Sequence, residues 1–215
     1  MGIAETAKTS VAKVRAASGT AVDQLSKVGH RDWMRRGYSM PAPQRVKWAV
    51  LDRYGAGVDV WVETGTFRGE TTAHLAGQAP RVYSIEPSAE LARGATTTFA
   101  GNPRVTILHG VSEVELPKVL EGLAGGSVAF WLDGHFSAGI TFQGDADTPI
   151  REELAAIEQH RAKFSRVVVL VDDVRCFEPT DPEYSHYPDR SWLVGWADRN
   201  QLRWNIEHDI FVAWS

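Results

Sequence analysis

Cysteine is nearly absent from this sequence, and other features that mark particular protein classes are missing as well. Among 215 residues there is one cysteine, Cys176, which excludes an intrachain disulfide and a zinc site built from several thiolates. No run of about 18 apolar residues occurs, so we expect no transmembrane helix. The N-terminal stretch lacks the apolar core of a secretory signal. We therefore expect a cytoplasmic protein.

An excess of positive charge is also missing. The chain has 23 lysine and arginine residues against 27 aspartate and glutamate residues, a formal net charge of −4. Nucleic-acid binders usually carry a basic surplus that neutralises phosphates, so we expect no nucleic acid among its partners. With 43% hydrophobic and 23% charged residues, the composition is that of an ordinary folded protein. The length suits one α/β domain with a short appendage.

The appendage is expected at the N-terminus. Residues 1–29 contain neither an aromatic residue nor a proline, and their valines recur at roughly helical spacing. This pattern predicts a weakly amphipathic helix or a partly disordered arm, with a dimer contact or a lid over a site as the alternatives. Pro41 and Pro43 then introduce a further helix. We divide the chain into an N-terminal arm, residues 1–40, and a main domain, residues 41–215.

Strand and helix patterns alternate through the main domain. Continuous apolar runs separated by helical segments indicate a parallel sheet that is covered on both faces. The last two runs are too close together for a helix between them, which predicts an antiparallel hairpin. The expected strands are 58–63, 81–86, 104–109, 127–133, 166–172, 201–206 and 210–214, and the expected helices are 41–54, 69–76, 88–99, 113–123 and 148–163. The predicted fold class is α/β: a doubly wound, Rossmann-like sheet of seven strands, mostly parallel, with an antiparallel C-terminal hairpin.

Two predicted connections, 134–147 and 175–191, are long for a compact domain. Both follow strands, so both lie at the carboxyl edge of the sheet, where open α/β folds bind ligands. Their aromatic rings beside acidic side chains suit a neutral, polyhydroxylated ligand better than a polyanion, and the alternative is that the rings pack the loops onto the domain. These residues are Phe136, Phe142, Tyr184, Tyr187, Trp192, Asp145, Asp147, Asp181 and Glu183.

The turn after the first predicted strand reads ETGTFRG, residues 63–69. Phe67 and Glu70 occupy the second and third glycine positions of a dinucleotide-binding fingerprint, and Glu70 also breaks the register of a P-loop. What remains is a carboxylate–glycine turn in which Glu63 faces a cationic or hydroxylated ligand, and Gly65 lets the backbone approach it closely. S-adenosylmethionine has this character, because its ammonium and sulfonium stand beside a carboxylate.

The next two predicted strands end in residues that suit the adenosine part of the same ligand. Glu86 ends the second strand, and a carboxylate there can accept hydrogen bonds from both ribose hydroxyls. Small residues after the third strand allow adenine to lie flat. The residues predicted to bind the cofactor are Glu63, Gly65, Thr66, Phe67, Gly69, Thr71, Glu86, Pro87, Gly110, Val111, Ser112 and Asp133.

Taken in order, these elements resemble those of the class I S-adenosylmethionine-dependent methyltransferases. The resemblance covers about residues 58–214 and includes the seven-strand pattern with its reversed last strand. It implies S-adenosylmethionine as the cofactor and methyl transfer as the activity. Two alternatives stay open: a nicotinamide-dependent oxidoreductase on a Rossmann-like sheet, and a non-catalytic binding module with a methyltransferase fold.

Three carboxylates follow the fourth and fifth predicted strands. Asp133, Asp172 and Asp173 would converge at adjacent strand ends, where they would repel one another unless a cation lay between them. Mg²⁺ or another hard divalent cation takes oxygen ligands and leaves positions for a substrate. The alternative is that these residues cap helices or form salt bridges with Arg175 or Arg190.

This pattern resembles metal-dependent O-methyltransferases of the catechol type, and its Asp-Asp pair looks closer to the macrocin-type sugar O-methyltransferases. The segment from Asp133 to Ile150 also looks like bacterial methyltransferases from polysaccharide and natural-product contexts. The resemblance implies a Mg²⁺-dependent O-methyltransferase with Asp133 at the catalytic centre. The catechol family's lysine near this aspartate is absent, and His135 stands there instead. We expect His135 to accept the proton as general base, and the alternative is that it only hydrogen-bonds the loop. We expect a small-molecule acceptor, a sugar, glycoside or saccharide precursor, with a homodimer left open.

Overall fold

The computed structural model describes residues 29–134, 148–178 and 180–215. The chain divides into two compact units, Met1–Lys47 and Trp48–Ser215. In the first unit residues 29–35 are helical, and the ring of Tyr38 meets that of Trp33 edge-on at 5.0 Å. In the described ranges, no helix combines the length and the apolar character needed to cross a membrane.

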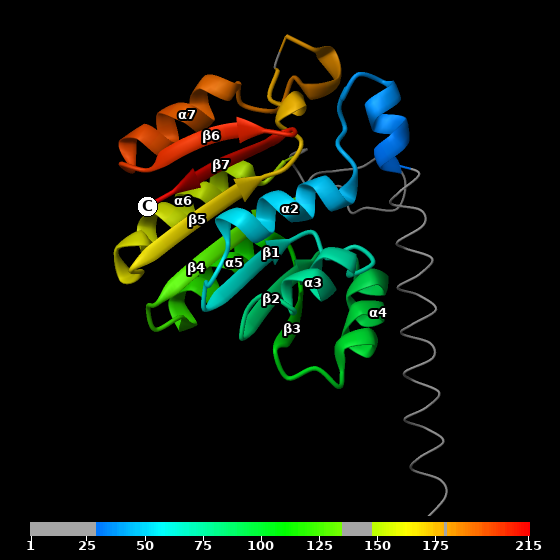
Figure 1. Cartoon of the computed structure of the whole chain (residues 1–215). Helices are drawn as coiled ribbons and strands as arrows, with labels where there is room; N and C mark the ends of the chain where they lie inside the picture. Colours follow the sequence, from blue (N-terminus) through cyan, green and yellow to red (C-terminus); the bar gives the residue numbers. More distant parts are fainter. Residues whose placement is uncertain (1–28, 135–147, 179) are drawn as a thin grey trace, which may run out of the picture. The chain divides into compact units, whose positions relative to one another are not determined.

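A seven-stranded sheet forms the centre of the second unit (Figure 1). Its order is β3-β2-β1-β4-β5-β7-β6, and the strands are β1 (Val60–Thr64), β2 (Arg81–Glu86), β3 (Val105–His109), β4 (Ser127–Leu132), β5 (Arg166–Val171), β6 (Arg203–Glu207) and β7 (Ile210–Trp214). The first five strands are parallel, and β7 runs antiparallel to both β5 and β6. The predicted α/β class, the seven strands and the antiparallel C-terminal hairpin are therefore confirmed.

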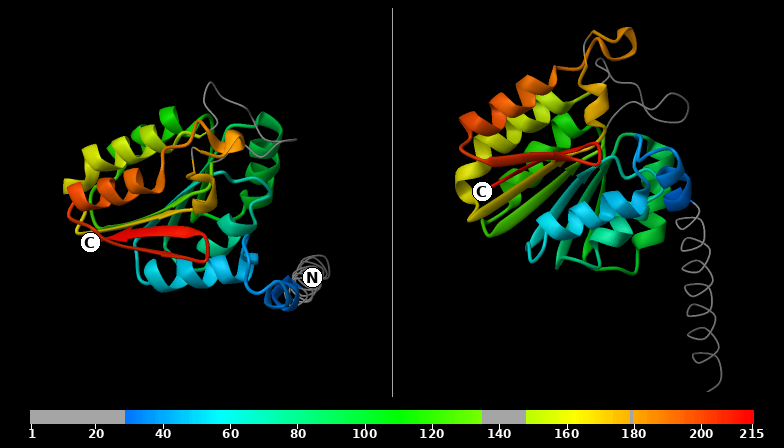
Figure 2. Two further views of the ribbon diagram at one scale, coloured as in Figure 1. Left: turned by 90° about the horizontal axis from the view of Figure 1, so that it is seen from above. Right: turned by 45° about the horizontal axis from the view of Figure 1, so that its top comes forward.

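Helices cover both faces of this sheet (Figure 2). On one face Leu116, Leu154 and Leu193 of three helices pack in the same cluster as the inward residues of β1, β4 and β5. On the other face the cluster includes Leu51 and Leu75 from two further helices. The helices are α2 (Gln44–Tyr54), α3 (Glu70–Leu75), α4 (Ala89–Phe99), α5 (Ser112–Gly122), α6 (Ile150–His160) and α7 (Arg190–Arg199), with short 3₁₀ turns at Arg161–Lys163, Val174–Cys176 and Pro182–Tyr184.

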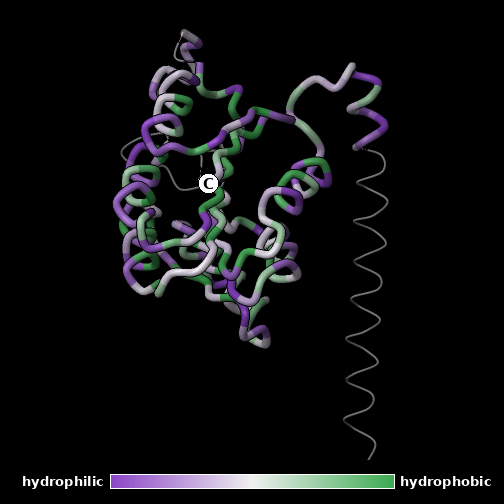
Figure 3. Tube along the Cα trace, turned by 60° about the vertical axis from the view of Figure 1, so that its left-hand side comes forward, coloured by the Kyte–Doolittle hydropathy of each residue, from purple (hydrophilic) through white to green (hydrophobic). Residues whose placement is uncertain are grey.

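The central strands are buried on both sides because neighbouring side chains point to opposite faces and helices cover each face. All five residues of β1 are buried, and so are the last five of β4 and β5. Figure 3 shows hydrophobic residues along the strands in the middle of the unit, with hydrophilic residues alternating along the helices. This double burial explains why these strands read as unbroken apolar runs in the sequence.

The stretch between β5 and the final hairpin differs from the prediction. Residues 175–191 were expected to be one long loop, and no helix was assigned before the final hairpin. The structure instead has two short 3₁₀ turns there, and α7 begins at Arg190. Asp189 caps this helix by accepting a hydrogen bond from the backbone N–H of Trp192 at 3.0 Å. By contrast, the predicted cap at Ser88 is present, and it accepts from the N–H of Leu91.

The sheet order places a topological switch point between β1 and β4. From β1 the chain builds outward through β2 and β3, and from β4 it builds in the opposite direction. At the carboxyl end of this pair, the N–H of Asp133 donates to the carbonyl of Thr64 at 3.1 Å. Open α/β sheets bind ligands in the crevice outside such a switch point. The site is therefore built here from the turns that follow each strand.

Candidate functional site

The turn after β1 depends on a glycine at its first position. Gly65 has a φ of 90°, and a Cβ placed on it would lie 2.5 Å from the backbone oxygen of Asp133. The N–H of Gly65 donates to the carbonyl of Ile85 at 2.9 Å. The turn thus lies directly against the end of β4 and is tied to β2. Any side chain at Gly65 would separate these strand ends or distort the turn.

Phe67, in the same turn, adopts a left-handed conformation with a φ of 48°. This conformation is unfavourable for a bulky residue, so surrounding contacts must hold it. The contact is Glu86 at the end of β2, whose Oε2 accepts the N–H of Phe67 at 2.8 Å. Both residues were predicted for the cofactor site, but the hydrogen bond by which Glu86 holds Phe67 was not predicted.

The carboxylate of Glu86 keeps room for a further ligand. Its Oε1 accepts the N–H of Ser88 at 2.9 Å, so each oxygen receives one backbone hydrogen bond. A carboxylate oxygen has two lone-pair sites, which leaves one on each oxygen for a hydroxyl group. The side chain is only 3% exposed, so a ligand bonded to it would be largely removed from water. This geometry suits the predicted pair of ribose hydroxyls.

Glu63 lies beneath the turn and is fully buried. Its Oε2 accepts hydrogen bonds from Thr72 at 2.5 Å and Ser84 at 2.6 Å, and Ser84 also shares a 2.6 Å hydrogen bond with Thr66. Burial raises the pKa of Glu63 to about 7, the two hydroxyls lower it in part, and the charge of Glu86 raises it further. These contacts fasten the turn to α3 and β2, while a direct contact between Glu63 and a ligand stays a prediction.

The remaining predicted cofactor residues surround this turn. Gly69 has a φ of 77°, and a Cβ there would lie 2.8 Å from the ring of Phe99. The hydroxyl of Thr71 accepts the indole N–H of Trp48 at 3.3 Å, so it contacts α2. After β3, the N–H of Gly110 donates to the carbonyl of Glu86 at 3.1 Å, which joins the ends of β2 and β3. The remaining predicted residues are Pro87, which comes directly after β2, and Val111 and Ser112, which stand at the start of α5.

The three predicted metal ligands lie at neighbouring strand ends, as expected from the sheet. Asp133 follows β4 and Asp172 follows β5, and the N–H of Asp172 donates to the carbonyl of Leu132 at 3.0 Å. The side chain of Asp172 is buried, and its Oδ1 accepts the N–H of Asp173 at 2.8 Å. The three residues are therefore neighbours along the sheet edge.

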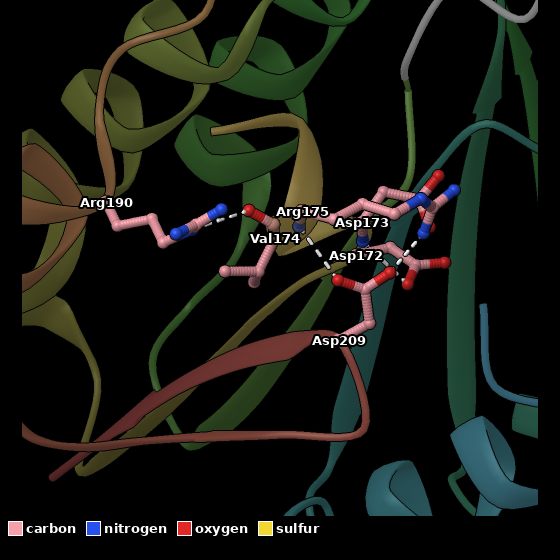
Figure 4. A network of polar contacts seen from close by, with 6 residues as sticks. All are labelled: Asp172, Asp173, Val174, Arg175, Arg190 and Asp209. Carbon is pink, nitrogen blue, oxygen red and sulfur yellow. Dashed lines mark hydrogen bonds and ion pairs between the residues drawn. The ribbon is translucent and has the colours of Figure 1, made fainter. Parts of the chain in front are cut away.

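Asp173 forms an ion pair with Arg175 (Figure 4), in which Nη1 lies 2.7 Å from Oδ1. The same guanidinium pairs with Asp209, which lies in the turn between β6 and β7, and Asp209 also accepts the backbone N–H of Arg175 at 2.8 Å. Arg190 donates to the carbonyl of Val174 at 3.3 Å. The salt bridge to Arg175, which the sequence analysis kept as an alternative to metal binding, is present.

The described residues do not fit the predicted Mg²⁺ site. Within the described ranges, no three histidine, cysteine, aspartate or glutamate side chains form a group that could hold a metal ion. Asp173 also has a cationic partner already in Arg175. A hard divalent cation needs several oxygen ligands directed at one point. Asp133, Asp172 and Asp173 do not form such a group among the described residues.

Several predicted residues of the two long loops fall outside the described part of the chain: His135, Phe136, Phe142, Asp145 and Asp147. The aromatics of the second loop pack onto the domain. Tyr187 meets Phe177 edge-on at 5.3 Å, and Tyr184 lies 5.9 Å from Tyr187. Arg151 lies over the ring of Trp192 at 4.9 Å.

One acid at this edge was missed by the sequence analysis. Glu153, in the first turn of α6, is 2% exposed, and burial raises its pKa to about 7. A Cβ on Gly134 would lie 3.5 Å from its Oε1 and 3.3 Å from Oγ1 of Thr64. The signal was available, because Glu153 falls between Ile150 and Leu154 on the apolar stripe of the helix, where a charged residue is exceptional.

Comparison with known proteins finds likeness in three-dimensional structure. No protein-family model and no curated protein sequence matches the chain. A putative rRNA methylase from Clostridium thermocellum superimposes with a TM-score of 0.52 at 12% identity, over 79% of this chain and 94% of that one. The 23S rRNA methyltransferase ErmE gives 0.51 at 13% identity, over 82% and 68%. An O-methyltransferase family protein from Burkholderia thailandensis gives 0.50 at 13% identity, over 79% and 55%.

These identities are low, so the likeness is one of fold. The shared architecture is that of class I S-adenosylmethionine-dependent methyltransferases, which the sequence resemblance had implied. The same fold hosts many acceptors, and the reaction must therefore be argued from the site.

Proposed function

We propose that this chain is an S-adenosylmethionine-dependent methyltransferase that holds its methyl donor across the carboxyl ends of β1, β2, β3 and β4. The observation that carries the proposal is the carboxylate of Glu86. It fixes the strained turn at Phe67 and still has one acceptor site on each oxygen for the ribose hydroxyls. The likeness in fold to methyltransferases of known structure supports the same ligand.

The residues around Glu86 suit the rest of that cofactor. Gly65 brings the backbone of the turn close to the end of β4, where no side chain fits. Gly110 is tied to Glu86 through the backbone, so the segment from Gly110 to Ser112 is in place to line the adenine. When bound, S-adenosylmethionine supplies an electrophilic methyl group on its sulfonium. The chain's contribution is to bind and orient this group at the switch point beside an acceptor.

The acceptor that we propose is a hydroxyl group of a small polar molecule, of which a saccharide is the leading example. Support comes from the net charge of −4, which disfavours a polyanion. Two of the similar structures are named for rRNA, so an RNA acceptor is the second candidate. The predicted dependence on Mg²⁺ stays a prediction that the geometry of the described residues does not support.

The proposed function is tested first by binding and then by turnover. Calorimetric titration with S-adenosylmethionine, S-adenosylhomocysteine and NADH separates a methyltransferase from a nicotinamide-dependent oxidoreductase. We expect the first two to bind and NADH not to bind. Tight binding of NADH alone would contradict the proposal.

Transfer of a radiolabelled methyl group is then measured with mixed saccharides and with RNA as acceptors. Labelled saccharide supports the proposed acceptor, and labelled RNA in its place would overturn that part of the proposal. Binding of the donor with no transfer to any acceptor, even with crude extracts as the acceptor source, would favour a non-catalytic module.

A further inference from the structure

Two buried oxygen atoms face the switch point and are not used by the contacts described above. They are Oε1 of Glu153 on α6 and Oγ1 of Thr64 at the end of β1. Their residues are 2% and 1% exposed, and within the described part of the chain neither atom has a partner at full hydrogen-bond geometry, although the hydroxyls of Ser112 and Thr64 are close enough to act on the Glu153 carboxyl. Buried polar atoms in native proteins are nearly always paired, so an unpaired couple indicates a missing partner.

Gly134 lies beside these oxygens. A Cβ on Gly134 would come within 3.3 Å of Thr64 Oγ1 and 3.5 Å of Glu153 Oε1. Gly134 follows Asp133, whose backbone oxygen lies closest to the place where a Cβ on Gly65 would be. The two oxygens therefore lie just behind the point where the turn after β1 meets the end of β4.

The electrostatic setting of Glu153 favours a positively charged partner. Burial raises its pKa to about 7, and the hydroxyls of Ser112 and Thr64 lower it in part. Among the described residues, the charged neighbours that act on this carboxyl are Glu113 on α5 and Glu152 on α6, and both raise its pKa further. A cation bound nearby would favour the ionised carboxylate and relieve the cost of burying it.

The proposed orientation of the cofactor brings such a cation to this place. With the ribose on Glu86 at the end of β2, the remainder of the molecule extends along the sheet edge toward β1 and β4. The sulfonium is the charged atom that joins the ribose to the methionyl part. In that orientation the sulfonium would lie near the backbone at Gly65 and Gly134, on the side where Glu153 and Thr64 are buried.

We infer that Glu153 is a positioning residue that recognises the positive charge of the sulfonium, so that this site binds S-adenosylmethionine more tightly than S-adenosylhomocysteine. The demethylated product has a neutral thioether in place of the sulfonium and loses this attraction. Preferential binding of the donor would speed exchange of product for donor after each turnover. The inference rests on the proposed function, since it requires that the donor binds at this edge.

The experiment compares the dissociation constants of the two ligands in the wild-type protein and in Glu153→Gln at pH 8. Glutamine keeps the size and removes the charge. We expect the dissociation constant of S-adenosylmethionine to rise about tenfold, the order expected when one charge–charge attraction in a partly buried site is lost. That of S-adenosylhomocysteine should change less than twofold. Glu158→Gln, at an exposed position of the same helix, is the matched control and should alter neither value.

The outcomes separate this inference from the proposed function. If the wild-type protein binds neither ligand, the proposed function fails. If it binds both and Glu153→Gln weakens them equally, or weakens neither, the proposed function stands and this inference is wrong. Equal weakening would assign the carboxylate to the ammonium group that both ligands share. Should Glu153→Gln not fold, the wild-type protein is titrated from pH 6 to pH 8, and an unchanging ratio of the two affinities overturns the inference.

Discussion

Replacing Glu153 with glutamine should stabilise the ligand-free protein at pH 8. The carboxyl is fully buried, and its pKa is about 7 in the folded protein against an ordinary value of 4.5. The folded state therefore binds the proton more strongly than the unfolded state does. The stability that this carboxyl contributes is fully present below about pH 4.5 and is lost as the pH rises through 7. The difference amounts to roughly 3 kcal/mol, at about 1.4 kcal/mol for each tenfold change in the ionisation constant.

Glutamine cannot ionise, so it removes this loss. At pH 8 we expect Glu153→Gln to raise the free energy of unfolding by about 3 kcal/mol, or the Tm by about 6–12 °C for a domain of this size. At pH 5 the folded wild-type carboxyl is already neutral, and the two proteins should differ by less than about 1 kcal/mol. The measurement is thermal and urea denaturation from pH 5 to pH 8, with Glu158→Gln, at an exposed position of α6, as the control.

The pH dependence distinguishes this cause from ordinary repacking. A glutamine that merely packs better or worse would shift the stability equally at every pH. Equal stability of the two proteins at pH 8, or a destabilised variant there with no change at pH 5, would refute the reasoning. The carboxyl would then be ionised without cost, through a partner that the described residues do not supply.

Three further predictions test other parts of the site. Glu86→Ala should weaken binding of S-adenosylmethionine by about 1.5–3 kcal/mol, because hydrogen bonds to a charged group are lost. Glu90→Ala, on the exposed side of α4, should leave the affinity unchanged, and calorimetry of both variants tests this. Arg175→Met should destabilise the fold by about 3–5 kcal/mol in urea denaturation, because it leaves the buried carboxylate of Asp209 without its cation, and a loss under 1 kcal/mol would contradict this. EDTA should leave the binding of S-adenosylmethionine unchanged, since Glu86 and the turn at Gly65 need no ion. Loss of binding on chelation that added Mg²⁺ restores would support the predicted metal site.

Much of the fold could be predicted because its determinants are local. The buried strands β4 and β5 read as unbroken apolar runs, since helices cover both sides of each. The close spacing of the last two runs left room only for a hairpin, which is what β6 and β7 form. The exception is α7, which begins at a capping aspartate directly after a stretch rich in proline and tyrosine. Its buried Leu193, Trp196 and Ala197 do have helical spacing, so the signal for this helix was present in the sequence.

The side-chain partners within the site could not be predicted in the same way. The sequence placed Asp172 and Asp173 at a strand end, but whether they meet a metal or an arginine depends on Asp209, which the hairpin brings from 34 residues beyond Arg175. Likewise, the hydrogen bond from the N–H of Phe67 to Glu86 joins two residues that are 19 positions apart in the sequence. Such contacts follow from sheet geometry and not from spacing along the chain. Glu153 differs, because a charged residue on an apolar helix stripe is visible in the sequence.

The order of the strands has a further consequence at the outer edge of the sheet. β6 is the terminal strand, and its exposed Trp204 and Ile206 alternate with polar and charged neighbours over only five residues. Such a short, charged edge is a poor template for pairing with another chain. The strand behind it, β7, has the sequence IFVAW and is buried over its first four residues. Fraying or proteolytic loss of β6 would expose an uncharged, strongly β-forming strand. The exposed edge strand therefore protects the strand behind it from aggregation.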